Sequence, residues 1–359
     1  MADDVIHSRE QVTPDWLTGV LARSGALETG RVTAIEVDSR ERILSTSNRL
    51  RIDYSEEATG LLPERLFLKT VNADMDEEFF GPSEVNYYVR DYQGLACAPI
   101  PHCYDAAFSE GQRRYHLLLD DLSPTHIEAK HKPRTLAYGL ALAEGLACLH
   151  AHQWGARRIV AAGEVLPTSR QIERFVEVAQ PGAGHIIDAF SDELEPHWPA
   201  MIRGILAHHP RSMAERARDG AGFTLIHGDP NWNNILVPRE GDRPLFLIDR
   251  QPFDWSLTVW LGVYDLAYAL VLDWDIDERR RFELPLLKYY HSQLIERGIR
   301  DYPWERLYDD YRLSVAMCVY VSIEWCRGGI NEQWTHVWLP MLQYSLTACD
   351  DLRCSELWT

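Results

Sequence analysis

The sequence lacks the features of a disulfide-stabilised, zinc-stabilised or membrane-spanning protein. Its seven cysteines are odd in number and scattered, with no CxxC pair or Cys/His cluster, so neither a disulfide framework nor a structural zinc site is indicated. No run of about 18 uncharged apolar residues occurs, which argues against a membrane span. The acidic start, residues 1–4, is not followed by the apolar segment of a secretory signal. We therefore expect a cytoplasmic protein.

Positive charge is also scarce. The chain has 36 Lys and Arg against 54 Asp and Glu, for a formal net charge of −18. Such an acidic protein repels nucleic-acid phosphates and anionic lipid surfaces, so we expect neither nucleic acid nor a membrane as its partner. The excess of acid could attract a cationic substrate or serve solubility alone. Both a monomer and a homodimer remain open.

The sequence pattern indicates two structural units that differ in secondary structure. A chain of 359 residues favours two structural units sharing one cleft, and we place their boundary between residues 1–122 and 123–359. The first unit has short alternating strands and one helix that opens after Pro82; the second is mainly helical, interrupted by one hairpin. The expected strands are 31–37, 49–54, 66–71 and 115–119, followed by the hairpin 235–248; the expected helices are 83–92, 135–152, 169–179, 195–208, 264–272, 277–297, 304–326 and 332–347.

Three residues around the hairpin form the strongest chemical signal. Asp229 can orient an attacking hydroxyl and accept its proton, Asn234 can offer an amide oxygen to a magnesium ion, and Asp249 can offer a carboxylate to the same ion. The hairpin explains the spacing, because it folds Asp249 back beside Asn234. Taken singly, each piece has an ordinary explanation, as a common tripeptide, a polar turn or a strand cap. In this order on one frame, they indicate phosphoryl transfer.

The same motif carries a resemblance to a known family. His227-Gly228-Asp229-x4-Asn234, followed by Ile248-Asp249-x-Gln251, resembles the catalytic core of the aminoglycoside phosphotransferase/choline kinase-like superfamily, which is related in fold to protein kinases. The resemblance implies an α+β, bilobal protein-kinase-like fold with a small antiparallel-sheet lobe and a larger helical lobe. It also implies ATP and Mg²⁺ as cofactors and a small-molecule hydroxyl as phosphoryl acceptor.

Features upstream of this motif agree with the resemblance. Residues 66–69 resemble the strand whose lysine, here Lys69, contacts the nucleotide phosphates, and Glu84 resembles its glutamate partner. A lysine within an apolar strand is costly unless its ammonium meets an anion, although it could also extend to water from a strand end. Asp120, Asp121 and Leu122 resemble the hinge whose backbone holds adenine.

The sequence also departs from the protein-kinase pattern. Residues 39–48 take the place of the loop that covers the phosphates but contain no glycine. Hydroxyls of Ser45, Thr46 and Ser47 could contact phosphate there, or the segment could be an ordinary polar turn. There is no Asp-Phe-Gly triplet. Arg250, which follows the metal aspartate, could add charge near the phosphates or pair with a surface acid.

Two further residues are interpreted as supports of the site rather than as reactants. Asp265 resembles a family aspartate that accepts hydrogen bonds from backbone amides of the catalytic loop. His227 invites a general-base role, but Asp229 is already placed for that work. We therefore expect both His227 and Asp265 to be scaffolding.

The acceptor site is the least readable part of the sequence. Candidates are Asp273, Asp275, Glu324 and Trp325, because acids and aromatics suit an amine-bearing substrate. Trp334 and Trp338, four residues apart, could add an aromatic wall to that site. The alternative is a solvated helix end beside core tryptophans. Aminoglycoside-like antibiotics, amino alcohols, amino sugars and steroid-type alcohols all remain open.

The sequence therefore predicts an ATP- and Mg²⁺-dependent O-phosphotransferase acting on a small molecule. One alternative is a catalytically silent nucleotide-binding regulator of the same fold. Another is a protein kinase, against which the missing glycines and the missing Asp-Phe-Gly triplet count.

Overall fold

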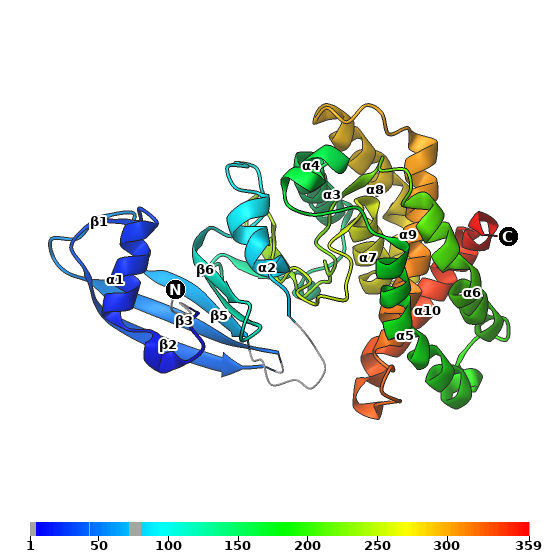
Figure 1. Cartoon of the computed structure of the whole chain (residues 1–359), viewed down its shortest axis with the longest axis horizontal. Helices are drawn as coiled ribbons and strands as arrows, with labels where there is room; N and C mark the ends of the chain where they lie inside the picture. The colour runs from blue at the N-terminus through cyan, green and yellow to red at the C-terminus, as the bar shows by residue number, and fades with distance from the viewer. Residues whose placement is uncertain (1–4, 43, 72–79, 359) are drawn as a thin grey trace.

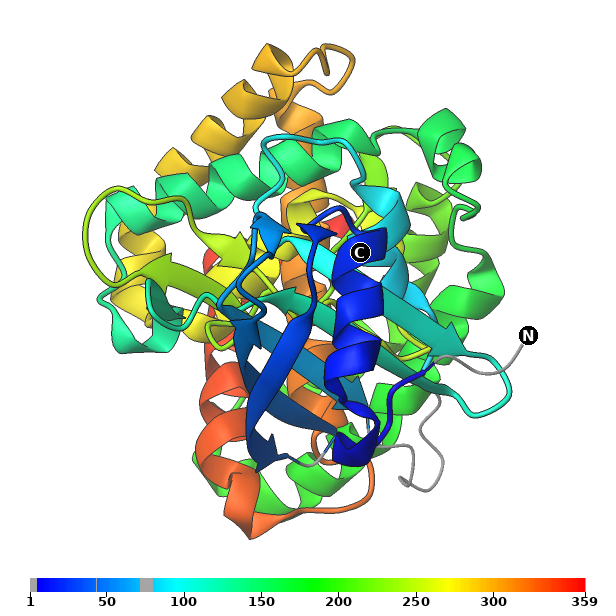
Figure 2. The same ribbon diagram turned by 90° about the vertical axis from the view of Figure 1, so that its left-hand side faces the viewer.

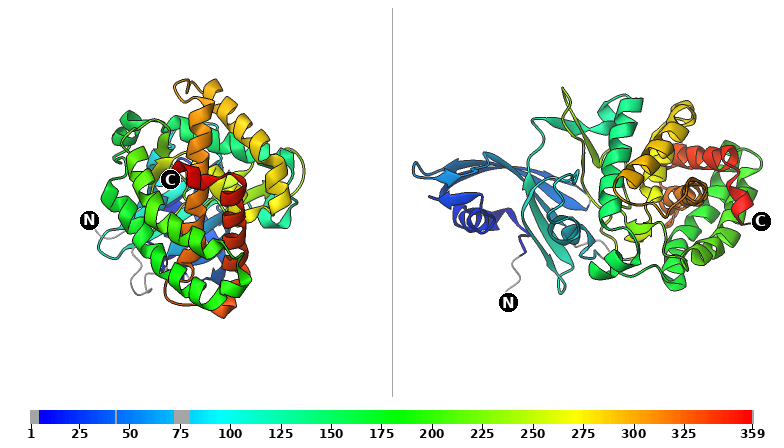
Figure 3. Two further views of the ribbon diagram at one scale, coloured as in Figure 1. Left: turned by 90° about the vertical axis from the view of Figure 1, so that its right-hand side faces the viewer. Right: turned by 90° about the horizontal axis from the view of Figure 1, so that it is seen from above.

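The computed structural model describes residues 5–42, 44–71 and 80–358. The chain forms a smaller lobe built on an antiparallel sheet and a larger helical lobe (Figure 1). Seen from above, the two lobes lie side by side along the long axis, and the C-terminus lies at the far end of the helical lobe (Figure 3). The expected α+β bilobal fold is confirmed.

The small lobe is organised around a five-stranded sheet of order β2-β3-β5-β7-β6. Helix α1 (Pro14–Arg23) lies across one face of this sheet (Figure 2) and buries Leu17, Val20 and Leu21 against apolar strand residues that include Leu50 and Leu68. A separate pair joins β1 to β4. The strands are β1 (Leu27–Thr29), β2 (Val32–Glu41), β3 (Ser45–Tyr54), β4 (Thr59–Gly60), β5 (Arg65–Val71), β6 (Cys103–Ser109) and β7 (Arg114–Asp120).

The opposite side of the small lobe carries a helix directed toward the large lobe. Helix α2 (Ser83–Asn86) continues as a π-helical turn, Tyr87–Asp91, as expected for a helix at 83–92. Val85 and Tyr87 belong to a hydrophobic core that extends without interruption into the helical lobe. This continuity fixes α2 relative to the segments that follow the hairpin.

The large lobe is a packed set of helices with two small β elements. Strand β10 (Ile235–Pro238) pairs with β11 (Phe246–Leu247), which confirms the hairpin, and also with β8 (His126–Glu128). Strand β9 (Phe223–Leu225) pairs with β12 (Val259–Leu261). No helix in the described part of the chain is long and apolar enough to cross a membrane. The helices are α3 (Leu136–His152), α4 (Ala156–Ala161), α5 (Ser169–Phe190), α6 (Trp198–Arg216), α7 (Val263–Asp273), α8 (Ile276–Glu296), α9 (Trp304–Glu324) and α10 (Thr335–Asp351).

Two helices run further than predicted because they continue through proline. The expected ends at residues 179 and 208 lie just before Pro181 of α5 and Pro210 of α6. Proline removes one backbone donor and disfavours a helix interior, so the sequence suggests an end there. Packing overrides this preference: residues beyond each proline, including Ile186 and Met213, are fully buried.

The segment expected to be a polar loop at residues 39–48 is mostly strand. β2 runs to Glu41 and β3 begins at Ser45, so the connection comprises only residues 42–44, of which Ile43 lies outside the described residues. The prediction of a loop there is wrong. The reason is pairing: Ser39 to Glu41 are opposite Asn48 to Thr46, and Ser45 to Ser47 also pair with β5.

Candidate functional site

The loop between β9 and β10 holds Asp229 and Asn234 against each other. The Asn234 amide nitrogen, Nδ2, donates 3.0 Å hydrogen bonds to both the backbone oxygen and Oδ2 of Asp229. Both bonds use the nitrogen, so the amide oxygen is the atom left to face a cation. Asn234 is buried and lines a cavity between the lobes.

The hairpin brings Asp249 beside Asn234. Ile235 pairs with Leu247, and the Ile248 amide donates to the Asn234 carbonyl at 2.9 Å. Asp249 follows directly with a φ of +58°, a left-handed conformation that is uncommon for aspartate and that tends to occur at functional sites. Its side chain is 46% exposed and lines the same cavity as Asn234. Asn234 and Asp249, which the sequence predicts to lie beside each other, are therefore neighbours in the fold.

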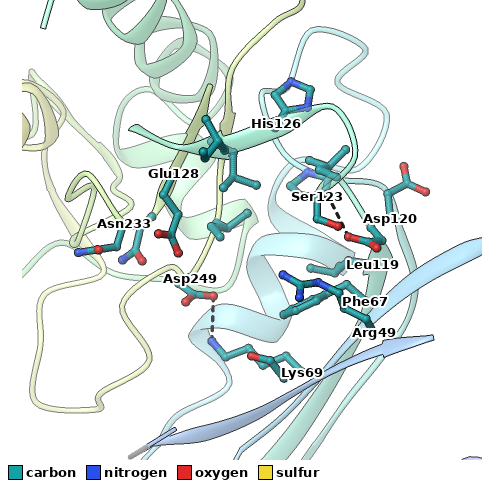
Figure 4. Close-up of a pocket in the computed structure, with 18 of the residues that line it drawn as sticks. Arg49, Phe67, Lys69, Leu119, Asp120, Ser123, His126, Glu128, Asn233 and Asp249 are labelled. Atoms are coloured by element: carbon teal, nitrogen blue, oxygen red, sulfur yellow. Dashed lines mark hydrogen bonds and ion pairs between the residues drawn. The ribbon is translucent and has the colours of Figure 1, made fainter. Parts of the chain in front are cut away.

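Lys69 links the small lobe to Asp249. Its ammonium lies 3.1 Å from Asp249 Oδ1 and 2.8 Å from both carboxylate oxygens of Glu84, and Tyr115, which sequence reasoning missed, donates its hydroxyl hydrogen to Glu84. Burial opposes the charged ammonium, but Asp249 and Glu84 more than offset it and raise the pKa of Lys69. Lys69 therefore stays cationic and is aimed at the cavity, as Figure 4 shows.

The cavity around these groups has a volume of about 430 Å³ and reaches the predicted hinge. Asp120, Asp121 and Leu122 line it, but the two aspartate side chains are held by local bonds. Asp120 Oδ1 accepts from the Tyr104 hydroxyl at 2.8 Å, and Asp121 Oδ1 accepts from the Ser123 amide at 3.0 Å. One oxygen of each carboxylate is therefore engaged within the protein.

Strand alternation divides the three predicted hydroxyls. Ser45 and Ser47 line the cavity, but Thr46 does not. Successive strand residues point to opposite faces, so Thr46 shares its face with the buried Leu50, on the α1 side of the sheet. Three further residues that line the cavity were not predicted from the sequence: Arg40, Arg42 and Arg49. They follow the same alternation as Ser45 and Ser47.

Asp229 faces away from this cavity toward a second one. Its carboxylate accepts from the Tyr268 hydroxyl at 2.6 Å and from Asn231 Nδ2 at 2.8 Å. Withdrawal from water raises the pKa of Asp229 to about 6, although these donors favour the ionised form. Tyr268 was missed, but it lies three residues after Asp265 on α7 and so shares its helix face.

Asp265 and His227, the two residues predicted to support the site, bind backbone groups of the loop between β9 and β10 and of the residues next to it. Asp265 accepts hydrogen bonds from the amides of His227 at 2.7 Å and Gly228 at 2.9 Å, and from His150 at 3.0 Å. His227 Nε2 lies 2.9 Å from the Ile248 carbonyl, and its Nδ1 accepts from the Asp229 amide at 3.3 Å. Burial lowers the pKa of His227 to about 4, so the ring is neutral and both of its nitrogens are occupied by backbone.

Arg250 lines neither cavity, although Asp249 lines the smaller one and Gln251 the larger one. It is 2% exposed and forms a 2.6 Å ion pair with Asp91 at the end of the π-helical turn. It also donates to the carbonyls of Ile226 at 3.0 Å and Thr258 at 3.3 Å. Arg250 thus ties the π-helical turn to the residues that adjoin the paired strands β9 and β12.

The second cavity, of about 920 Å³, opens on the helical lobe beside Asp229. Asp273, Asp275, Glu324 and Trp325 all line it, as does Trp334. Trp338 instead lies fully buried in the core, because its position one helical turn after Trp334 faces Phe190 of α5, with ring centroids 5.1 Å apart. The expected aromatic wall therefore contains Trp334 but not Trp338.

Known structures resemble this architecture, although no protein-family model and no curated protein matches the sequence. A choline kinase from Cryptosporidium parvum Iowa II superposes with a TM-score of 0.56 at 12% identity, over 90% of this chain and 91% of the other. A spectinomycin phosphotransferase in complex with ADP and spectinomycin gives 0.52 at 10% identity, over 94% and 98%. A microcompartment-associated aminopropanol kinase gives 0.52 at 14%, over 89% and 92%. The similarity extends over nearly the whole of each chain.

Proposed function

We propose that this chain, which has the protein-kinase-like fold of these small-molecule kinases, is an ATP- and Mg²⁺-dependent O-phosphotransferase that acts on a hydroxyl of a small molecule. One observation carries the proposal: where the two cavities meet, Asp229 is hydrogen-bonded to Asn234, and Lys69 to Asp249 and Glu84. The backbone bond between Ile248 and Asn234 sets Asp249 beside Asn234. The nucleotide would occupy the smaller cavity and the acceptor the larger one. Asn233 lines both.

The donor set of the smaller cavity fits a magnesium ion. Asn234 supplies a neutral amide oxygen and Asp249 a partly exposed carboxylate, which are the hard oxygen ligands that Mg²⁺ accepts together with water and phosphates. Bound there, the ion would neutralise charge on the triphosphate. The left-handed backbone of Asp249 directs its carboxylate toward Lys69 at the mouth of this cavity.

Lys69 would bind the phosphates from the side of the sheet. Glu84 and Tyr115 hold the ammonium and its partner in place, so the charge is oriented before the nucleotide arrives. The adenine would lie at residues 119–122, which line the cavity. The ADP bound to the structurally similar spectinomycin phosphotransferase supports an adenine nucleotide here.

Asp229 would position the acceptor hydroxyl and take its proton. Ionised above a pKa of about 6, the carboxylate is charged at neutral pH and still basic enough to accept a proton late in transfer. Tyr268 and Asn231 hold its Oδ1. His227 would not act as the base, because its nitrogens are already engaged by backbone groups.

The test is transfer of one phosphoryl group to a panel of hydroxylated amines, sugars and sterols, followed by mass spectrometry. Asp229→Asn should lower kcat by about 10²–10⁴-fold and leave ADP affinity nearly unchanged. Asp301→Asn, at an exposed position outside both cavities, is the matched control. Undiminished transfer by Asp229→Asn would eliminate this mechanism, and thermal stabilisation by Mg²⁺–ATP without transfer to any acceptor would favour the silent regulator.

A further inference from the structure

The larger cavity has the size of a site for a bulky ligand. Its volume of about 920 Å³ lies at the upper end of the range typical of pockets that enclose drug-sized molecules. A small amino alcohol would leave most of it unfilled. The cavity runs from Asp229 at one end to Trp325 and Trp334 on the helical lobe, so a ligand that fills it extends well beyond its reacting hydroxyl.

Two pairs of aromatic rings line this cavity. Phe253 and Trp255 stack with centroids 5.4 Å apart and an interplanar angle of 11°. Trp325 and Trp334 form a second pair at 5.7 Å, and Trp325 remains 40% exposed, the most exposed tryptophan among the large hydrophobic side chains at the described surface. Such rings offer flat apolar surface, and they also attract cations.

The carboxylates that would attract a cation are already engaged. Asp273 Oδ2 accepts the Trp232 amide at 2.6 Å, and Asp275 caps helix α8 by accepting the Glu278 amide at 3.0 Å. Glu324 pairs with Arg327 at 2.9 Å. Each of these acids therefore has a structural partner within the protein.

Burial also shifts two of these acids toward their neutral forms. Withdrawal from water raises the pKa of Glu324 to about 7 and raises the pKa of Asp273 well above its ordinary value, although the Trp232 amide opposes this change. A site built for a polycation would instead keep its carboxylates solvated and ionised.

Two basic side chains beside this cavity are themselves paired with acids, Lys130 with Glu128 at 2.5 Å and Arg134 with Glu278 at 3.8 Å. The guanidinium of Arg134 lies 4.6 Å from the centre of the Trp232 ring, so the protein itself supplies a cation to that face. The ammonium of Lys130 lies 2.9 Å from Asn233 Oδ1, beside the catalytic loop. Both residues line the cavity.

We infer that the acceptor is a large, uncharged and mostly apolar alcohol, with its hydroxyl on a polycyclic or macrocyclic ring system, rather than a polycationic amino sugar or a small amino alcohol. This inference rests on the proposed function. The acceptor hydroxyl oxygen forms a bond to the γ-phosphorus as the bond to the bridging oxygen of ADP breaks. Asp229 takes the hydroxyl proton and returns it to solvent, so the products are a phosphate monoester and ADP.

The experiment compares four acceptors with the full-length chain, in the presence of Mg²⁺. Testosterone and the macrocyclic aglycone 6-deoxyerythronolide B represent uncharged ring alcohols; kanamycin and choline represent cations. Calorimetry with Mg²⁺–ADP measures affinity, and mass spectrometry with Mg²⁺–ATP measures transfer. At least one ring alcohol should bind roughly tenfold more tightly than either cation, as expected from its larger apolar contact area, and should gain a phosphoryl group.

Two variants separate apolar recognition from charge recognition. Trp325→Ala should weaken binding of the ring alcohol by about tenfold through lost aromatic contact, whereas Glu324→Gln should change it by less than about twofold. Leu61→Ala, exposed on the small lobe away from both cavities, is the control for removing exposed apolar surface. Tighter binding of kanamycin or choline, a larger loss in Glu324→Gln than in Trp325→Ala, or no binding of either ring alcohol would overturn the inference.

These failures are distinguishable from failure of the proposed function. Phosphorylation of kanamycin or choline, lost in Asp229→Asn, would leave the phosphotransferase proposal standing and remove only the acceptor class. Transfer to any acceptor that persists in Asp229→Asn would instead contradict the catalytic assignment itself.

Discussion

The two cavities that meet at the catalytic loop differ in how their charged groups are held. On the nucleotide side, Lys69, Glu84 and Asp249 are paired with one another, and Lys69 and Asp249 face open space. On the acceptor side, Asp273 and Asp275 are bonded to backbone amides of the protein. Lys69 and Asp249 are therefore accessible to a ligand in the first cavity, whereas Asp273 and Asp275 stabilise the fold around the second.

The largest expected effect comes from replacing Arg250, whose guanidinium joins the two lobes through its ion pair with Asp91. Arg250→Met removes the fully buried partner of Asp91, which keeps only its ion pair with the partly exposed Arg90. Because one partner remains, we expect a loss at the lower end of the range of about 3–5 kcal/mol that removal of one member of a buried ion pair costs. Chemical denaturation would measure the change in free energy of unfolding. Arg211→Met, which removes the solvent-exposed pair with Glu215, should cost less than about 1 kcal/mol. Equal losses in the two variants would contradict the structural role of Arg250.

The nucleotide side should depend strongly on the presented ammonium. Lys69→Met should lower kcat/KM for ATP by about 10²–10³-fold, because it removes a preoriented donor to the phosphates. Steady-state kinetics measure this change. Lys288→Met, at an exposed position on α8, is the control for loss of a lysine. A decrease of less than threefold in Lys69→Met would mean that the ammonium only pairs with Glu84 and Asp249.

The carboxylate between the cavities should set the acid limb of the pH–rate profile. With a pKa of about 6, Asp229 is active when ionised, so kcat should be level above this value. Below it, kcat should fall by about tenfold per pH unit as the base is protonated. The measurement is kcat between pH 5 and 8, with folding checked at each pH by circular dichroism. A rate that stays constant or rises toward pH 5 would contradict the assignment.

The smallest expected effect tests whether Asp275 only caps helix α8 or also contacts the acceptor. Asp275→Ala removes the cap of α8 and should reduce stability by about 1 kcal/mol. The affinity for the acceptor should stay within about twofold, since this carboxylate serves the helix. Thermal unfolding and acceptor titration measure the two quantities. A large loss of affinity with unchanged stability would show that Asp275 belongs to the binding site.

The sequence predicted the nucleotide side better than the acceptor side for a physical reason. Asp229, Asn234 and Asp249 lie within 21 residues on one hairpin, so local geometry alone brings them together. Lys69 and Glu84 are only 15 residues apart, and the family resemblance indicated that they pair. Asp91 carried no local signal, because its partner Arg250 lies 159 residues away.

Elsewhere, single-residue preferences misled the interpretation. Helices α5 and α6 continue through Pro181 and Pro210, beyond the ends expected at residues 179 and 208. Polar residues 39–48 suggested a loop, yet two-sided pairing keeps most of them in strands. The engagement of Asp273 by the Trp232 amide, 41 residues away, depends on how α7 packs against the catalytic loop. None of these outcomes is contained in local composition.

The central claim is that Asn234 and Asp249 share one divalent cation beside the nucleotide, and its most direct test is the effect of Mg²⁺ on ADP affinity. Calorimetry with and without Mg²⁺ should show tighter ADP binding with the metal in the wild-type chain. Asp249→Asn and Asn234→Ala should each abolish most of this enhancement while the metal-free affinity changes little. An enhancement of wild-type size in both variants would contradict the account.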